Sequence, residues 1–400
     1  MKIAILTSHC PYNFGAHLQA FTTARYLKSL GHTPVVIDYD RKRREKIYRS
    51  KVPEVQWEAH DGFVTYKMPL SKNVNSKEGL KKLFLNDHFD GLIVGADAVW
   101  LWPDNMREIP AYFLDWFFEL PLSKNVPAVS MSVANMGCTY KKQSKREKEL
   151  VGSCLKKFTY ITVRDEWTKK SINRYIFGGE KVITNINPDP VFVMDQLIGD
   201  IKLDRKNIIA EDQKYIICTF PPNSSGIRKW FDEFKGILNQ KGYLVGLLPL
   251  PEGVADLEFD FVVPYPIDPL DWYLWLKNSS GFVGLRFHAV VCCITAGVPF
   301  ISMDVYGLPS KFFIVLNKLG FYNVSKFFDK KSKIFQLLKG TDFRKNRVHS
   351  VKGINKLKPI KAVKMLIDTS KEDLKELRDL NSSVFKKNFE NILNVFKNKN

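Results

Sequence analysis

Short apolar runs alternate with stretches of helical spacing along most of the chain. Residues 2–7 form an apolar run typical of a buried strand, and residues 16–30 carry apolar side chains at helical spacing. Gly31 follows as an expected C-cap, and the apolar run at 35–38 predicts a second strand. The start of the chain therefore predicts a βαβ unit.

The same alternation continues in two sets, separated by a polar stretch at residues 194–212. The first set predicts further strands at 92–94, 128–133, 161–163 and 181–184. The second set predicts strands at 215–220, 244–248, 261–263, 282–283 and 300–303, and helices at 229–240 and 289–296. Strands in this rhythm predict parallel sheets with helices on both faces.

We therefore expect an α/β protein of two doubly wound, Rossmann-like domains that face each other across a cleft, with C-terminal helices. This organisation resembles the GT-B architecture, in which ligands bind between the domains at the carboxyl ends of strands. The expected divisions are an N-terminal domain at 1–200, a C-terminal domain at 201–345 and a helical segment at 346–400 that packs back on the body. Residues 41–87 break the rhythm and are interpreted as an insertion near the mouth of the first domain.

The chain is strongly basic, with a formal net charge of +19. Such a balance attracts phosphate groups, whether free, lipid-linked or in nucleic acid. No recognition-helix, RRM or finger pattern accompanies the charge, so we do not expect nucleic acid as a partner. Basic clusters at residues 41–49 and 141–148 are either a solvated face or contacts with an anionic membrane.

No signal-peptide pattern follows the first apolar run, and no window approaches the ~20 apolar residues of a membrane span. The 6 cysteines show no CxxC spacing, which fits buried thiols in a reducing compartment. We expect a cytoplasmic protein, with the inner face of the cell membrane as an alternative place of action. The sequence shows no cluster of metal ligands, so we predict no metal.

The most informative segment follows the predicted strand at 282–283. Arg286 and His288 lie between that strand and the start of a helix, where backbone N–H groups favour an anion. Arginine forks onto a carboxylate or phosphate, and histidine transfers protons near neutral pH. Tyr306 and Lys311 follow the next strand, at the same edge of the sheet. We expect these side chains to converge, with purely structural roles as the alternative.

Polar side chains also follow strands in the first half of the chain. Arg164 ends the strand at 161–163 and is expected to point toward the cleft, with a plain salt bridge as the alternative. Asp97 follows a turn of small residues, where it can accept a bond from a sugar hydroxyl. Three more polar residues lie at the first strand-to-helix turn, a usual place for substrate contacts, although a packing role for the histidine stays open: Asn13, His17 and Gln19.

These segments resemble, in order and across nearly the whole chain, the motifs of the polysaccharide pyruvyl transferase family. Residues 12–21 are similar to the family's N-Y-G-A-x-L-Q-A-Y start, and residues 93–100 to its V-G-S-D-x-V-W element. Residues 163–166 resemble its S-V-R-[DE]-E element, and residues 187–190 its D-P segment. Residues 284–288 are similar to its R-x-H, and residues 297–311 to its G-x-P…Y…K ending.

The resemblance implies a GT-B-like transferase that moves the pyruvyl group of phosphoenolpyruvate onto a sugar of a surface or capsular polysaccharide, or of its lipid-linked precursor, as a pyruvate ketal. His288 is then the expected catalytic residue, and no cofactor is expected because phosphoenolpyruvate is a co-substrate. The resemblance assigns phosphoenolpyruvate to Arg164, Arg286, Phe287 and Lys311. It assigns the glycan acceptor to Asn13, His17, Gln19, Asp97 and Tyr306.

Two other functions stay open at this point. A nucleotide-sugar glycosyltransferase on the same scaffold would need an acidic residue to hold a ribose, and none stands out at the predicted strand ends of the second half. A non-catalytic relative would instead bind anionic glycolipid through its basic surface. The sequence predicts neither the acceptor sugar nor the oligomeric state.

Overall fold

Two parallel sheets form the framework of the chain, and most of the side chains of their strands are buried. The computed structural model describes residues 1–302 and 357–398, apart from positions 42–48, 104, 105, 107, 137, 206, 207, 221, 223, 252, 285, 369 and 370. The first sheet has the order β2-β1-β3-β4-β5-β6 and the second the order β11-β10-β7-β8-β9. Every strand pair in both sheets is parallel. The predicted α/β class with two doubly wound sheets is therefore confirmed.

The first lobe comprises the first sheet and the helices that pack on it. Its strands are β1 (Lys2–Leu6), β2 (Thr33–Val36), β3 (Gly91–Val94), β4 (Ala128–Val133), β5 (Tyr160–Val163) and β6 (Asn185–Ile186). Its α-helices are α1 (Phe14–Ser29), α3 (Glu54–Lys67), α4 (Lys77–Asn86), α5 (Lys145–Lys157) and α6 (Glu166–Tyr175). Short 3₁₀ turns are η1 (Arg49–Lys51), η2 (Ala111–Phe113) and η3 (Pro121–Lys124).

The second lobe comprises the second sheet with its helices. Its strands are β7 (Tyr215–Thr219), β8 (Leu244–Leu247), β9 (Phe261–Val262), β10 (Gly281–Gly284) and β11 (Phe300–Ser302). Its helices are η5 (Ser225–Ile227), α8 (Arg228–Gln240), α9 (Pro269–Lys277), α10 (Phe287–Ala296) and α14 (Pro359–Ile367). The chain changes from one sheet to the other between β6 and β7, through η4 (Pro190–Val193) and α7 (Asp195–Ile198). The division predicted at residue 200 lies in this connection.

The alternation of strand side chains explains how each sheet acquires two cores. In β1, Ile3 and Ile5 pack with α1 and the C-terminal helix α15 (Lys371–Lys397), whereas Ala4 and Leu6 pack with α4 and α5 on the other face. The second sheet is covered in the same way by α9 and α10 on one face and by α8 and α14 on the other. Each lobe is thus a sheet between two helical layers.

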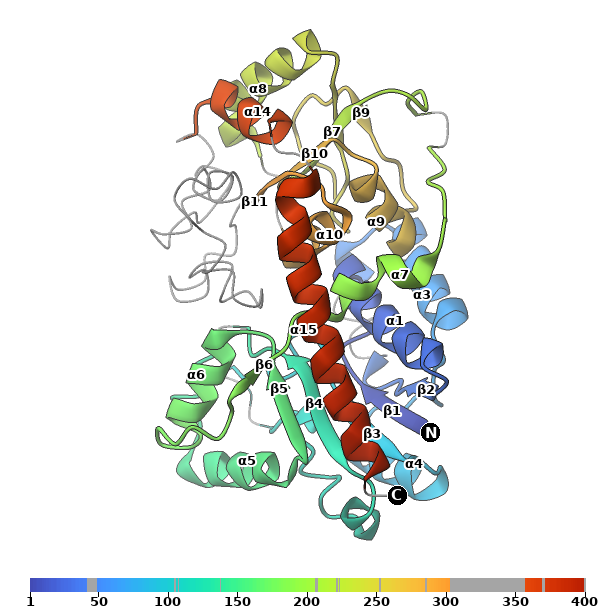
Figure 1. Ribbon diagram of the computed structural model, residues 1–400, viewed down its shortest axis with the longest axis vertical. Helices are drawn as coiled ribbons and strands as arrows, with labels where there is room; N and C mark the ends of the chain where they lie inside the picture. The colour runs from blue at the N-terminus through green and yellow to red at the C-terminus, as the bar shows by residue number, and fades with distance from the viewer. Residues whose placement is uncertain are drawn as a thin grey trace.

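Helix α15, drawn in red, runs along both lobes and ends beside β3 (Figure 1). Its first turns place Leu374 and Leu377 in the core around α9 and α10, and its later turns place Phe389 and Phe396 in the core of the first lobe. The Phe396 ring lies where a side chain at Gly91 would be, 2.7 Å from the position of an added Cβ. The tail is helical, as expected, and its apolar stripe is buried against both lobes.

One predicted detail is wrong. Residues 181–184 form no strand, because the Asn173 side chain bonds both the N–H and the C=O of Ile183, and the sheet partner of β5 is the next segment, β6. The described part of residues 41–87, interpreted from the sequence as an insertion, has regular structure. It forms α3 and α4, and its connections bridge to the edge of the first sheet at Val36 and Tyr39.

The lobes dock directly on each other through α1 and α3. The Phe14 ring stacks on Trp272 of α9, with centroids 5.2 Å apart. The Gln56 carboxamide forms two hydrogen bonds with the backbone of Ile267, at 2.9 and 2.8 Å. The loops after β3, β5 and β6 meet the start of α10 at this junction, so the carboxyl ends of the two sheets lie against one another.

Candidate functional site

Arg164 lies at the centre of the lobe junction, directly after β5. Its Nη1 donates to Asp97 Oδ1 and to Asp189 Oδ2, both at 3.1 Å, and its guanidinium lies 4.3 Å from the centre of the Phe287 ring of the second lobe. Its Nε is buried and has no hydrogen-bond partner among the described residues. Burial opposes the positive charge, but the carboxylates of Asp97 and Asp189 outweigh it and raise the pKa of Arg164.

Asp189 is the carboxylate that both lobes share. It is fully buried, and as the N-cap of η4 its Oδ1 accepts the N–H of Val191 at 3.1 Å. Its Oδ2 faces Arg164 of the first lobe and lies 3.3 Å from His288 Nε2 of the second. Burial alone would raise the pKa of Asp189, but His288 and Arg164 lower it. An ionised carboxylate is therefore fixed between the two candidate site residues.

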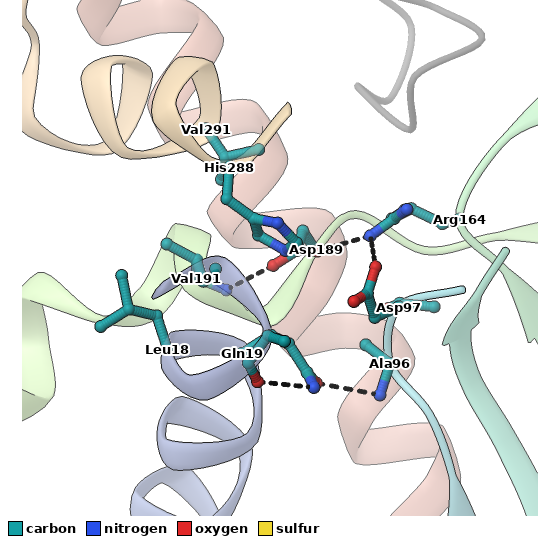
Figure 2. Close-up of polar contacts among 12 residues, drawn as sticks. Leu18, Gln19, Ala96, Asp97, Arg164, Asp189, Val191, His288 and Val291 are labelled. Atoms are coloured by element: carbon teal, nitrogen blue, oxygen red, sulfur yellow. Dashed lines mark hydrogen bonds and ion pairs between the residues drawn. The ribbon is translucent and has the colours of Figure 1, made fainter. Parts of the chain in front are cut away.

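Figure 2 shows His288 pointing from α10 toward Asp189, with Arg164 and Asp97 beyond it. The 3.3 Å contact is short enough for an ion pair, but Nε2 is not aligned for a hydrogen bond within the described part of the chain. The side chain is only 10% exposed. Two further neighbours among the described residues are the Phe287 ring, nearly perpendicular at 5.1 Å, and the backbone of Gly15. A buried imidazole with a ring nitrogen toward the junction suits proton transfer there.

Asp97 and Arg286 both have strained backbones. Asp97 has φ +74°, and Arg286, the N-cap residue of α10, has φ +84°. Residues other than glycine rarely adopt such positive φ values. The Asp97 backbone is held by Ala134 N–H, which donates to its carbonyl at 2.8 Å, and its carboxylate keeps 19% exposure. Strained residues cluster at binding and catalytic sites. Asp97, Arg286 and Phe287 are the partly exposed members of this site.

The residues predicted at the first turn are used inside the protein. The Asn13 carboxamide caps α1, with its Oδ1 accepting the N–H groups of Gly15 and Ala16. His17 is buried and donates through Nδ1 to the His9 carbonyl at 2.8 Å, and burial lowers its pKa to about 3. Gln19 is fully buried and its carboxamide links the Thr7 hydroxyl to the Ala96 N–H. These three side chains shape the junction from within, and we do not propose them as acceptor contacts.

Tyr306 and Lys311, the remaining predicted site residues, lie outside the described residues. Within the described ranges, no three His, Cys, Asp or Glu side chains come together in a way that could hold a metal ion. Asp189 and Gly15 are the additions that the structure makes to the site. In the sequence, Asp189 stands out only as part of a motif. An aspartate followed by a proline is typical of a helix N-terminus as much as of a functional site.

The two facing α/β lobes, with a charged site between the carboxyl ends of their sheets, define a GT-B-like enzyme scaffold. The sequence then gives the family. The chain belongs to the polysaccharide pyruvyl transferase family, whose family model matches residues 13–305. That range includes every described residue of the site.

The chain is also similar to solved structures. The MnaA–UDP structure from S. aureus aligns with a TM-score of 0.50 at 11% identity, over 92% of this chain and 90% of that one. A putative UDP-N-acetylglucosamine 2-epimerase from Listeria monocytogenes gives 0.47 at 10% identity, over 94% and 90%. The glycosyltransferase SnogD from Streptomyces nogalater gives 0.46 at 12%, over 96% of each chain. No protein of curated function is detectably similar in sequence. At these identities the likeness concerns the fold alone.

Proposed function

We propose that this chain transfers the pyruvyl group of phosphoenolpyruvate to two hydroxyls of a sugar in a surface polysaccharide or its lipid-linked precursor. The observation that carries the proposal is the shared carboxylate: Arg164 of one lobe and His288 of the other both face Asp189. Arg164 also has a buried nitrogen, Nε, without a hydrogen-bond partner within the described ranges. Unpaired polar nitrogens of this kind are costly unless a ligand uses them.

The donor carries a carboxylate and a phosphate, and the proposed site offers cations for both. Arg164 binds one anionic group from the first lobe, and Arg286 binds the other from the start of α10, where helix N–H groups add to the attraction. Phe287 lies against the Arg164 guanidinium and keeps that side of the donor dry. A low-polarity wall strengthens every charge interaction in the site.

His288 is the proposed proton-transfer group. A proton added to the methylene carbon of the donor makes its C2 cationic, and a sugar hydroxyl adds at C2 while its own proton leaves. Loss of phosphate and addition of a second hydroxyl close the cyclic ketal. Asp189 holds the imidazole and stabilises its protonated form, so that the ring can take up one proton and release another during each turnover.

Asp97 is the proposed acceptor contact. Its carboxylate is the more exposed of the two that face Arg164, and it extends from the first lobe toward the same junction. When the donor binds Arg164 in place of Asp97, the Asp97 carboxylate becomes available to accept a hydrogen bond from a sugar hydroxyl. We further propose that the enzyme acts in the cytoplasm, where phosphoenolpyruvate is made, and that its basic surface contacts the anionic membrane. In the described part of the chain, no helix is long and apolar enough to cross a membrane.

A comparison of donors tests the proposal. The purified protein is titrated with phosphoenolpyruvate and, separately, with UDP-sugars by calorimetry. The proposal predicts binding of phosphoenolpyruvate that Arg164→Met weakens at least about 10-fold, since a charged hydrogen bond pair contributes roughly 1.5–3 kcal/mol. Binding of UDP-sugars alone would instead support a nucleotide-sugar glycosyltransferase.

The reaction itself is tested in cells that carry the gene. Mass spectrometry of their surface glycan should show the carboxyethylidene increment, three carbons with two hydrogens and two oxygens, and deletion of the gene should remove it. His288→Ala should fail to restore the increment, whereas His88→Ala, whose side chain is 88% exposed, should restore it fully. An unchanged glycan after deletion would refute the proposed function.

A further inference from the structure

Gly15 is a glycine without a conformational reason. It is the second residue of α1, a helix in which its neighbours have side chains, and it is not among the residues with positive φ. Glycine in a helix is less favourable than alanine because it loses more backbone freedom on folding. Gly15 therefore makes α1 less stable than alanine would at this position. The reason for a glycine here has to come from the residues that lie next to it.

The neighbour is the His288 imidazole. A Cβ added to Gly15 would lie 2.2 Å from Cγ and Nδ1 of His288 and 2.4 Å from its Cβ. Cβ atoms essentially never come this close to another heavy atom, so the ring or the helix would have to move. Only a residue without a side chain lets the ring lie against α1 as it does.

The surface that Gly15 offers is itself rigid. The Asn13 side chain accepts the N–H groups of Gly15 and Ala16, at 3.0 and 3.3 Å, which fixes the first turn of α1. Phe14 stacks on Trp272 of the second lobe, with the ring planes 10° apart. A ring that is displaced from Gly15 cannot simply push this turn aside.

His288 is thus placed by two groups that its own lobe does not supply. Gly15 belongs to the first lobe and limits the ring on one side, and Asp189, in the connection between the lobes, faces Nε2 at 3.3 Å. We infer that Gly15 is a positioning residue for the catalytic imidazole, acting through the absence of its side chain, and that docking of the two lobes at this residue aligns His288. This inference rests on the proposed function, because it takes His288 to be the proton-transfer group.

The direct test replaces Gly15 by alanine. Gly15→Ala should lower the carboxyethylidene content of the surface glycan by about 100-fold, because a displacement of about 1 Å at a catalytic group can cost that much. Phosphoenolpyruvate should still bind the purified variant, with a Kd within about 3-fold of the wild type, since Arg164 is unchanged. The imidazole nitrogen resonances of His288 should shift in 15N-histidine spectra.

The matched control is Gly62→Ala. Gly62 also lies in a helix of the first lobe, in α3, but a Cβ added there would have nothing within 4 Å. This variant should keep the wild-type glycan, donor affinity and His288 resonances. An effect of alanine in a helix as such would appear in both variants.

A double substitution separates positioning from general damage to the fold. In a His288→Gly background, both the ring and the Cβ that would collide with residue 15 are gone. The drop in melting temperature caused by Gly15→Ala in the wild type should therefore be absent in this background. An equal drop in melting temperature in both backgrounds would overturn the inference. Glycan pyruvylation by Gly15→Ala at the level of Gly62→Ala would overturn it too. Wild-type protein that neither binds phosphoenolpyruvate nor modifies the glycan would refute the proposed function instead.

Discussion

Two groups of buried titratable side chains lie at the lobe junction, and they are stabilised in opposite ways. In the first, here called the charged junction, Arg164 and Asp189 keep their charges because opposite charges lie within 3.1 Å. In the second, the histidine pair, the rings of His17 in α1 and His60 in α3 lie 4.7 Å apart, and burial lowers both pKa values. The comparison shows that burial alone neutralises a group, whereas a fixed counter-charge keeps it ready for chemistry.

The histidine pair also carries unsatisfied polar atoms. Both ring nitrogens of His60 and Nε2 of His17 are buried with no hydrogen-bond partner in the described part of the chain. Around them lie Tyr12, Phe14 and Phe63. An uncharged imidazole in such surroundings contributes shape and aromatic contact, not proton transfer. The environment of His17 therefore suits a packing role, the alternative that the sequence leaves open, better than proton transfer.

Asp189→Asn should have the largest effect on the charged junction, because it removes the negative charge that Arg164 and His288 share. Arg164 would keep its ion pair with Asp97, and His288 would lose its neighbouring carboxylate. We expect a loss of about 3 kcal/mol in the free energy of unfolding, as for other buried ion pairs that lose one partner. Urea denaturation at pH 7 measures it, and glycan pyruvylation should fall to background.

A surface pair provides the control for this loss. Asp379 pairs with Lys375 on α15 at 3.0 Å, and both side chains are at least half exposed. Asp379→Asn should cost less than about 1 kcal/mol. Equal effects of the two substitutions would show that the charged junction is no stronger than an ordinary surface pair.

His60→Leu should sharpen the other half of the comparison. Removing two unpaired buried nitrogens should raise the free energy of unfolding by about 1 kcal/mol at pH 7. The pH dependence should change as well. Since the folded pKa of each histidine is depressed, the unfolded chain binds more protons below about pH 6.5, and stability falls as the pH falls.

From pH 7 to pH 5 each fully depressed histidine removes about 2 kcal/mol of stability. The His60→Leu variant should therefore lose about 2 kcal/mol less than the wild type over this range in urea titrations. His88→Leu, at an exposed position, serves as control and should keep the wild-type slope. If the stability of His60→Leu depended on pH as steeply as that of the wild type, His60 would not be neutral in the folded state.

The sequence predicts the sheets well because their signal is local. β3 and β4 are buried along their whole length, so a continuous apolar run is a sufficient indication. The sequence does not predict helix α3, because the burial of its residues depends on distant parts of the chain. Two of its four buried residues are Gln56 and His60, polar side chains whose burial depends on the second lobe and on α1, and no apolar stripe appears in its sequence.

The site was predictable only in part. Arg164 and His288 follow strands, and position in the chain indicates both. The roles of Asp189 and Gly15 arise from contacts with His288, far along the chain, and no spacing rule reports such contacts. The burial of Gln19 was equally invisible, because its partner Ala96 comes from another strand end.

Asp97→Asn tests the exposed side of the charged junction. Asp97 competes with any incoming anion for Arg164 Nη1, which it contacts at 3.1 Å. Without its charge, phosphoenolpyruvate should bind about 5-fold tighter, a difference of about 1 kcal/mol. Glycan pyruvylation should fall nonetheless, since the proposed acceptor contact is lost. Asp87→Asn, which alters a surface pair with Lys2, is the control and should leave both measurements unchanged. Weaker donor binding by Asp97→Asn would show that Asp97 orients Arg164 and does not compete for it.

Asp165→Asn is expected to have the smallest effect, with a pH dependence of the opposite sign to the histidine pair. Asp165 caps α6 and is buried beside Arg164, and burial raises the pKa of Asp165 to about 6. The folded state therefore holds its proton between about pH 4 and pH 6 while the unfolded chain has lost it, so this carboxyl destabilises the protein as the pH rises through that range. Asparagine is an equally good cap without the buried charge. The variant should be about 1 kcal/mol more stable than the wild type at pH 7, and the advantage should vanish near pH 4. An advantage that persists at pH 4 would mean that the gain comes from packing and not from the charge.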